Sequence, residues 1–122
     1  MTEARRLAAV RVGTWAMAVL PGEIDMTCAA DVGANLGTLL GEGIAVLVAD
    51  MTASSFCDTA GVQALVAVHH AARAAGAQLR LVVPAATIRR AFELLEVDRV
   101  LHLYPSLDEA MADAPGSYRP SP

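Results

Sequence analysis

The residues of this chain best suited to chemistry are an acid and a hydroxyl that stand side by side, Asp58 and Thr59. A short polar segment separates them from the apolar run Ala45–Ala49, and a helical pattern over Ala60–Ala75 follows at once. At the first turn of a helix, such a hydroxyl can be a site of chemistry. The neighbouring carboxylate can also simply cap the helix, because the first N–H groups of a helix lack intrahelical partners. The rest of the chain bears on which interpretation holds.

Motifs for catalysis or metal binding are not recognisable in the sequence. It contains no GxSxG nucleophile elbow, no P-loop and no GxGxxG. His69 and His70 are neighbours on a helix and face different directions, which argues against a two-histidine metal site. One of them is predicted to be partly buried and the other solvated. Cys28 and Cys57 lack metal-ligand spacing and are predicted to be free thiols. We therefore expect no enzymatic activity, no cofactor and no metal site.

The length and composition are typical of one globular domain. A chain of 122 residues can bury a core, and 55% of its residues are hydrophobic. The net charge is −4 without a basic block, which argues against nucleic-acid binding. No apolar run reaches the roughly 20 residues of a membrane span, and no signal peptide is recognised, so we expect a cytoplasmic protein. We expect a single domain over 1–122, with a core over about 8–112 and a flexible tail over 113–122.

Strands and helices alternate over the last two-thirds of the chain, which predicts an α/β domain with crossover connections. An opening pair of strands, joined around Gly13, adds an antiparallel part and makes the β-sheet mixed. Thr27 and Ser106 are the predicted N-caps of the first and last helices. The expected strands, about five, are Leu7–Val12, Thr14–Leu20, Ala45–Ala49, Gln78–Val83 and Leu101–Tyr104. The expected helices, about four, run from Thr27 to about Leu40, over Ala60–Ala75, over Ala85–Glu96 and from Ser106 to about Ala112.

The helical periodicity also predicts which side chains fill the core. In the helix over Ala85–Glu96, the inward side chains are expected to be Ile88, Ala91, Phe92 and Leu95. Four methionines are interpreted as gap-fillers, namely Met17, Met26, Met51 and Met111. Gly33 and Gly37 are expected to let the first helix approach the sheet closely.

Three segments of the chain carry a family resemblance. Gly22–Asp25 is similar to a G-E-[LI]-D motif after a second strand, and Phe56–Val62 to F-x-D-[ST]-[SAT]-G-[LV] at a helix start. A closing strand-helix-strand is matched by Leu79–Val82, Arg89–Leu94 and Val97–Val100. In this order and spacing they resemble the STAS domain family, and within it the bacterial anti-sigma factor antagonists. The resemblance covers nearly the whole chain and implies a single STAS-like domain.

The resemblance also implies a phosphorylation switch. In that family, the Ser or Thr after the Asp accepts a phosphate from a cognate anti-sigma factor, which is a serine kinase. The unphosphorylated protein binds that kinase and releases its sigma factor, and a PP2C-type phosphatase resets the cycle. The resemblance thus implies that Thr59 is the phosphorylation site, on a partner-binding surface with Asp25, Asp58, Ala60 and Gly61. Gly61 is expected to allow close approach by the partner.

Two positions depart from the family pattern. Ala60 stands where a second Ser is frequent, which leaves Thr59 as the only hydroxyl of its motif. Glu96 stands where many relatives have Gly, at a helix end. An alternative function stays open, that of a STAS-type interaction module in another assembly, such as a transporter accessory subunit or a stressosome-like scaffold. A homodimer is also possible.

Overall fold

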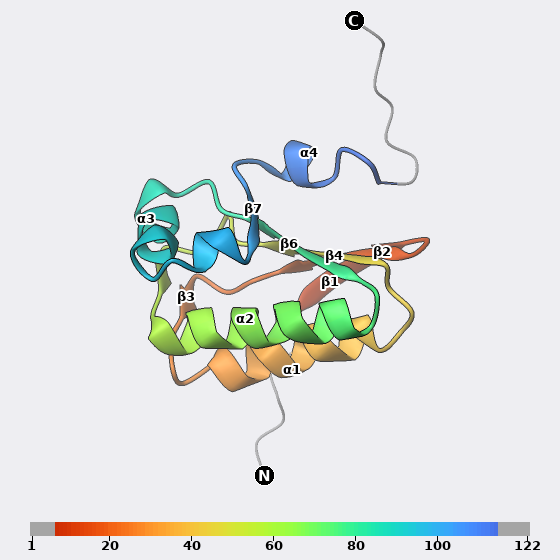
Figure 1. Cartoon of the computed structure of the whole chain (residues 1–122), viewed down its shortest axis with the longest axis horizontal. Coiled ribbons are helices and arrows are strands. Elements are labelled where there is room, and N and C mark those ends of the chain that lie inside the picture. The colour runs from red at the N-terminus through yellow and green to blue at the C-terminus, as the bar shows by residue number, and fades with distance from the viewer. Residues whose placement is uncertain (1–6, 115–122) are drawn as a thin grey trace, which may run out of the picture.

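Five strands form the central sheet in the computed structural model, which describes residues 7–114 (Figure 1). Their order across the sheet is β1-β2-β4-β6-β7. β1 is antiparallel to β2, and the remaining neighbours are parallel, so the prediction of a mixed α/β sheet is confirmed. A turn of two residues, Gly13 and Thr14, joins β1 to β2, and Gly13 takes the positive φ (59°) that such a turn needs. The bounds are β1 Ala8–Val12, β2 Trp15–Val19, β4 Val46–Asp50, β6 Gln78–Val82 and β7 His102–Tyr104.

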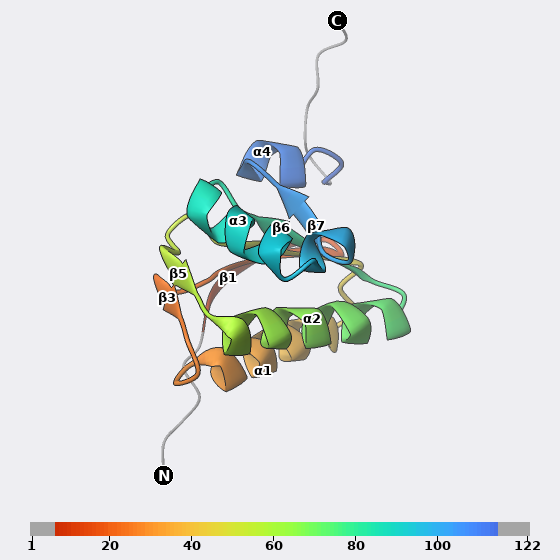
Figure 2. The same ribbon diagram turned by 60° about the vertical axis from the view of Figure 1, so that its left-hand side comes forward.

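The helices cover the two faces of this sheet unequally. Helices α1 (Ala29–Leu40) and α2 (Thr59–Ala74) lie side by side on one face, while the short α4 (Leu107–Ala110) lies on the other (Figures 1 and 2). Helix α3 (Ala86–Leu94) contributes Ile88 and Phe92 to the same core as α1 and α2. The larger core is built from long aliphatic side chains, among them Leu36, Leu47, Leu65 and Leu81. A smaller cluster lies under α4 and consists of Trp15, Val48, Val82, Ala110 and Ala114.

A second, two-stranded sheet lies beside the first and was not predicted. It pairs β3 (Glu23–Ile24) with β5 (Phe56–Cys57) in parallel. Each strand is only two residues long, so neither leaves a periodic signal in the sequence. Further bonds join the flanking residues, from Ser55 N to Gly22 O at 2.7 Å and from Ser54 Oγ to Pro21 O at 2.7 Å. The small sheet therefore fixes two loops that are far apart in the sequence side by side (Figure 2).

The start of α1 differs from the prediction. Its N-cap is Cys28, without a side-chain capping bond, whereas Thr27 was the predicted cap. The backbone N–H of Thr27 donates to Asp25 Oδ1 at 2.9 Å, and the Thr27 hydroxyl donates to the same oxygen. The Asp25 side chain thus holds a turn ahead of the helix and moves the helix start by one residue. The other predicted cap, Ser106 of α4, is confirmed, since its Oγ accepts from Glu109 N at 3.2 Å.

Two hydrophobic side chains expected inside are exposed. Leu95 is 47% exposed because α3 ends at Leu94 and Glu96 turns into the left-handed region at φ 59°. Met26 is 78% exposed and fills no gap, in contrast to the fully buried Met51. A short 3-10 helix, η1, follows α3 over Val97–Arg99. The division into core and tail stays a prediction, since residues 115–122 lie outside the described residues.

Candidate functional site

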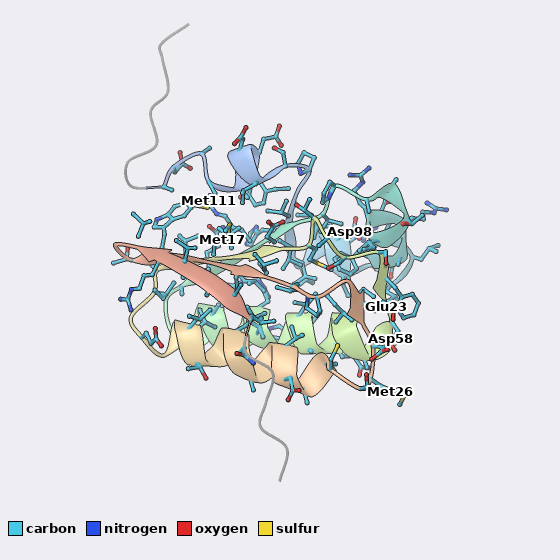
Figure 3. The ribbon with its side chains drawn as sticks, turned by 180° about the vertical axis from the view of Figure 1, so that it is seen from behind. Met17, Glu23, Met26, Asp58, Asp98 and Met111 are labelled. Carbon is cyan, nitrogen blue, oxygen red and sulfur yellow. The ribbon has the colours of Figure 1, made fainter. Side chains whose placement is uncertain are left out.

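The small sheet brings the acids of the two sequence motifs together. Its register aligns Glu23 with Phe56 and Ile24 with Cys57, so that Asp25 and Asp58 each follow a strand end. Asp58 N donates to Ile24 O at 3.0 Å, and Asp58 Oδ2 accepts from Met26 N at 3.2 Å. Figure 3 shows Glu23, Met26 and Asp58 at the same end of the molecule. The two predicted motifs therefore form one surface.

Asp58 is the N-cap of α2, as the sequence suggested. It has extended backbone angles (φ −88°, ψ −176°), and its Oδ1 accepts from Gly61 N at 3.0 Å. Its second oxygen holds Met26 N, so each carboxylate oxygen accepts a backbone N–H. A cap of this kind stabilises a helix by about 1 kcal/mol. The structure therefore gives Asp58 an architectural role, whatever partner it meets.

Thr59 begins α2 and is exposed. Its hydroxyl has no hydrogen-bond partner among residues 7–114. The first turn of the helix is anchored, because Val62 N donates to Asp58 O at 3.0 Å and Gly61 N donates to the Asp58 side chain. A free hydroxyl on a fixed, solvent-facing turn is accessible to an enzyme that modifies it.

Asp25 has a defined place in the turn before α1. In addition to the Thr27 bonds to its side chain, its carbonyl oxygen accepts from Cys28 N at 3.1 Å and from Ala29 N at 2.9 Å. The hydroxyl and the N–H of Thr27 lower the pKa of the Asp25 carboxyl, because hydrogen bonds to a carboxylate favour its charged form. Asp25 is therefore an anion at neutral pH, on the same surface as Asp58.

Gly61 is buried, and the packing inside the domain explains why it has no side chain. A Cβ at this position would lie 2.8 Å from Cys57 Sγ, 2.8 Å from Ile24 Cγ2 and 2.9 Å from the Ile24 carbonyl oxygen. The first turn of α2 therefore lies directly against β3 and β5. The expected contact of Gly61 with a partner stays a prediction.

Two exposed hydrophobic side chains lie on the same surface and were missed in the sequence. Met26 follows Asp25 and is 78% exposed, and Phe56 in β5 is 49% exposed. The signal in the sequence that could have indicated their exposure was their position in the two motif segments, outside any periodic pattern of a helix or strand. We call the surface made of Glu23, Asp25, Met26, Phe56, Asp58 and Thr59 the acidic rim. The segments that build it contain no lysine or arginine.

The cysteine next to the rim is not suited to nucleophilic chemistry. Burial, the charge of Asp58 and the nearby Cys28 together raise the pKa of the Cys57 thiol to about 12. The thiol is therefore protonated at neutral pH. Both cysteines are free, as predicted, and Cys28 Sγ donates to Glu23 O at 3.3 Å.

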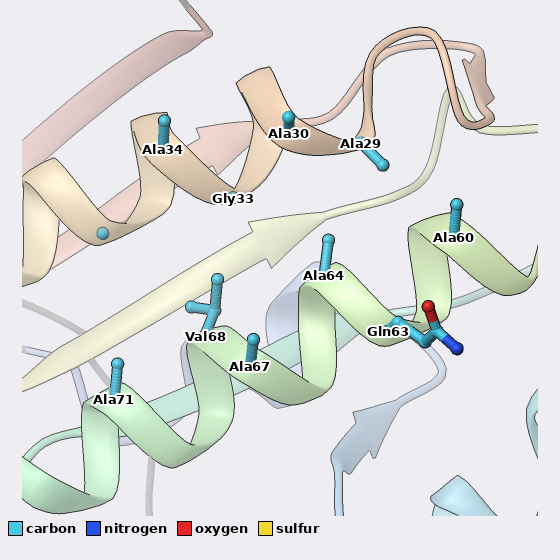
Figure 4. A pocket seen from close by; sticks show the side chains of 11 residues that line it. Ala29, Ala30, Gly33, Ala34, Ala60, Gln63, Ala64, Ala67, Val68 and Ala71 are labelled. Carbon is cyan, nitrogen blue, oxygen red and sulfur yellow. The ribbon is translucent and has the colours of Figure 1, made fainter.

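A shallow groove between α1 and α2 begins beside the rim (Figure 4). Its walls are almost all Gly and Ala, from Ala60 at one end to Ala71 at the other, with Gln63 as the polar side chain. A Cβ on Gly33 would lie 3.8 Å from Ala64 Cβ, and one on Gly37 would meet nothing within 4 Å. The prediction that these glycines allow close approach to the sheet is therefore wrong. Gly33 faces α2, and Gly37 faces open space.

The two adjacent histidines behave as the sequence predicts, since His69 is 3% exposed and His70 is exposed. His69 Nδ1 is buried and has no hydrogen-bond partner in the part of the chain that the structure describes. The centroid of the His102 ring lies 5.9 Å from that of the His69 ring. Burial lowers the pKa of His69, and the neighbouring His102, His70 and Arg73 lower it further. Within residues 7–114, no group of three His, Cys, Asp or Glu side chains is arranged to hold a metal ion.

Comparison with known proteins points to one family. A model of the STAS domain family matches residues 7–110. An anti-sigma factor antagonist from Mycobacterium paratuberculosis is 26% identical, with a TM-score of 0.73 over 87% of this chain and 90% of that one. The Bacillus cell fate determinant SpoIIAA in its phosphorylated form is 19% identical (TM-score 0.65, 87% and 96% covered). A sulfate transporter family protein from Wolinella succinogenes is 18% identical (TM-score 0.68, 84% and 86% covered). No curated protein matches the chain in sequence at a significant level.

Proposed function

The chain belongs to the STAS domain family, and on that premise we propose that it acts as an anti-sigma factor antagonist. In this proposal it binds a cognate anti-sigma factor kinase while Thr59 is unmodified, and the sigma factor is released. Phosphorylation of Thr59 ends the interaction, and a PP2C-type phosphatase restores it in the cytoplasm. The observation that carries the proposal is the exposed, unbonded Thr59 hydroxyl on a turn fixed by Asp58.

The chain needs no catalytic group of its own for this cycle. The kinase supplies the nucleotide and activates the hydroxyl, and the chain supplies a hydroxyl held in one place. Asp58 contributes by fixing the turn, because both of its carboxylate oxygens are bonded to backbone N–H groups. It is a positioning residue in this proposal.

A phosphate on Thr59 is compatible with the fold. Gly61 N is occupied by Asp58, but the N–H groups of Thr59 and Ala60 have no acceptor among residues 7–114. They lie at the positive end of the α2 dipole, where a phosphate is favoured. The modified protein is therefore expected to stay folded.

The same phosphate opposes docking of the acidic rim. It adds about −1.5 to −2 charges beside Asp25 and Asp58. Met26 and Phe56 are the apolar contacts that the rim offers, and a partner that packs on them must exclude water from the neighbouring Thr59. Burying a doubly charged group there is costly unless the partner pairs with it. Phosphorylation thus weakens binding through desolvation and repulsion.

The proposal is tested with ATP, a candidate anti-sigma factor kinase and the intact chain. We expect one phosphate per chain, mapped to Thr59 by mass spectrometry. Thr59→Ala should abolish the modification and keep binding, while Thr59→Asp should weaken binding at least tenfold. Ser55→Ala is the matched control, because Ser55 is a neighbouring exposed hydroxyl that bonds to Gly22 O. Phosphate on another residue, or unchanged binding of Thr59→Asp, contradicts the proposal.

A second candidate function is that of an interaction module in another assembly. The similarity to a sulfate transporter family protein supports it, and the described residues 7–114 contain no helix able to cross a membrane. A transporter accessory subunit or a stressosome-like scaffold would bind its partner with Thr59 unmodified and with Thr59→Asp alike. The kinase experiment therefore separates the two functions.

A further inference from the structure

We propose that the outer edge of β1 is a self-association surface, through which two copies of this chain join their sheets by antiparallel β1–β1 pairing. β1 is the edge strand of the sheet, and all five of its residues are exposed. The partner on this surface is a second copy of the chain. The proposal is independent of the phosphorylation switch.

The outward-facing backbone groups of β1 follow from the bonds that β2 makes. Leu20 N donates to Asp50 O at 2.9 Å, and Val46 N donates to Thr14 O, so the even-numbered residues of β2 face β4. The odd-numbered ones therefore face β1, where Val10 is opposite Met17 and Val12 opposite Trp15. Since Val10 and Val12 bond inward, the N–H and C=O groups of Ala9 and Arg11 point away from the sheet.

The ends of this edge are already occupied, which limits the free part to its middle. Leu7 N donates to Asn35 Oδ1 at 3.3 Å, and Gly13 O accepts from Arg11 Nε at 3.3 Å. Nothing in residues 7–114 pairs with the backbone groups of Ala9 and Arg11. Two residues with two donors and two acceptors are therefore available to an added strand.

The charges on β1 do not protect the edge. Arg11 is the single charged residue of the strand, and its guanidinium turns to the α1 face, where it donates to Glu42 O at 3.0 Å. It also lies 3.5 Å from the Glu42 carboxylate. Proline and lysine, which commonly block strand edges, are absent from β1. The side chains on the other face are Ala8, Val10 and Val12, and the two valines are 59% and 49% exposed.

One register makes the edge complementary to itself. If the two-fold axis passes through Val10, Ala9 of each copy lies opposite Arg11 of the other, and all free backbone groups of both pairs are used. Val10 then faces its own copy in a close, non-hydrogen-bonded pair. A register centred on Arg11 would instead place two guanidinium groups opposite each other. Charge and hydrogen bonding therefore select the Val10-centred register.

The exposed apolar surface continues beyond the strand. Val10 and Val12 lie on the same face as Trp15, a member of the cluster under α4, and Met17, which packs against that cluster. Figure 3 shows Met17 and Met111 on this face. Because the joined strands are antiparallel, the carboxyl ends of the two parallel sheets point in opposite directions, and both acidic rims stay accessible. The contact is small, so we expect a weak dimer, in the range below about 1,200 Å² of buried surface.

The test is the mass of the intact chain in solution, measured by light scattering from about 10 μM to 1 mM, which covers weak association. We expect the mass to rise with concentration from 12.7 kDa toward twice that value. Val10→Glu should raise the dissociation constant at least tenfold, because it places two like charges face to face. A mixture of Val10→Glu and Val10→Lys should associate again as a heterodimer, detected by native mass spectrometry.

The matched control is Leu94→Glu, which makes the same kind of change at a residue on α3 that is 68% exposed. It should leave self-association unchanged, and far-UV circular dichroism should show all variants folded. A wild-type mass that stays at 12.7 kDa up to the highest concentration overturns the proposal. Equal effects of Val10→Glu and Leu94→Glu, or no recovery in the mixture, overturn it as well.

Discussion

Replacing Gly61 by alanine probes how tightly the first turn of α2 is held against the small sheet. The added Cβ would come within 2.8 Å of Cys57 Sγ and Ile24 Cγ2 and within 2.9 Å of the Ile24 carbonyl oxygen. A thiol can move away by rotation, but a backbone oxygen in a paired strand cannot. We therefore expect Gly61→Ala to push α2 away from β3 and β5.

The size of the effect follows from two opposing contributions. Overpacking of a filled site costs about 1–3 kcal/mol. Alanine in place of glycine in a helix returns up to about 1 kcal/mol through backbone propensity. With the backbone contact at Ile24 in the upper part of the first range, we expect a net loss of about 2 kcal/mol. For a domain of this size, that lowers Tm by roughly 5–10 °C.

The assay is urea unfolding of Gly61→Ala beside Gly37→Ala, followed by circular dichroism. Gly37 is also a helical glycine, but a Cβ there meets nothing within 4 Å. The control should therefore raise the free energy of unfolding by up to about 1 kcal/mol. If Gly61→Ala is as stable as Gly37→Ala, the conclusion that the first turn of α2 packs directly against Ile24 is wrong. Amide NMR shifts confined to Ile24, Cys57 and their neighbours would locate the displacement.

Two further changes test separate features of the fold. Glu96 has φ 59°, a region where a side chain costs about 1 kcal/mol or more, so Glu96→Gly should stabilise the domain by about 1 kcal/mol. Glu93→Gly, inside α3, should destabilise it, and urea midpoints that move in the same direction for both variants would contradict this. Burial lowers the pKa of His69 below its ordinary value of 6.5 in the folded state. The free energy of unfolding should therefore be highest above pH 6.5 and should decrease as the pH falls through the lowered pKa. His69→Phe should flatten this acid-side loss between pH 7.5 and pH 5 in urea titrations; an unchanged slope would refute the assignment to His69.

Local patterns in the sequence were sufficient for the main sheet and its helices. The run Ala45–Ala49 and the alternation in Gln78–Val83 predicted β4 and β6 to within one residue, because buried strands need continuous or alternating apolar side chains. The capping role of Asp58 was also predictable, because a carboxylate just before a helical pattern can accept from the unpaired N–H groups of the first turn.

Interactions between distant segments explain what the sequence did not predict. β3 and β5 exist only as a pair, so neither could be recognised by itself. Thr27 was a suitable N-cap, but the side chain of Asp25 binds it in a preceding turn. Met26 and Phe56 have the composition of core residues, and only the folded loops show that they face outward. The candidate site was thus located by its polar residues, and its apolar part was missed.

The two hydrogen bonds that the Asp58 carboxylate accepts bear on how relatives of this chain can be interpreted. The carboxylate joins the start of α2 to the loop at Met26, and this structural role does not depend on a phosphate at Thr59. An asparagine could cap the helix through its oxygen, but the NH2 group in place of the second oxygen could not accept from the other backbone N–H. A homologue that has lost the switch is therefore expected to keep the acid and to change the hydroxyl residue. Asp58 has a structural role that the hydrogen bonds show, and the regulatory role of Thr59 is the part that we propose.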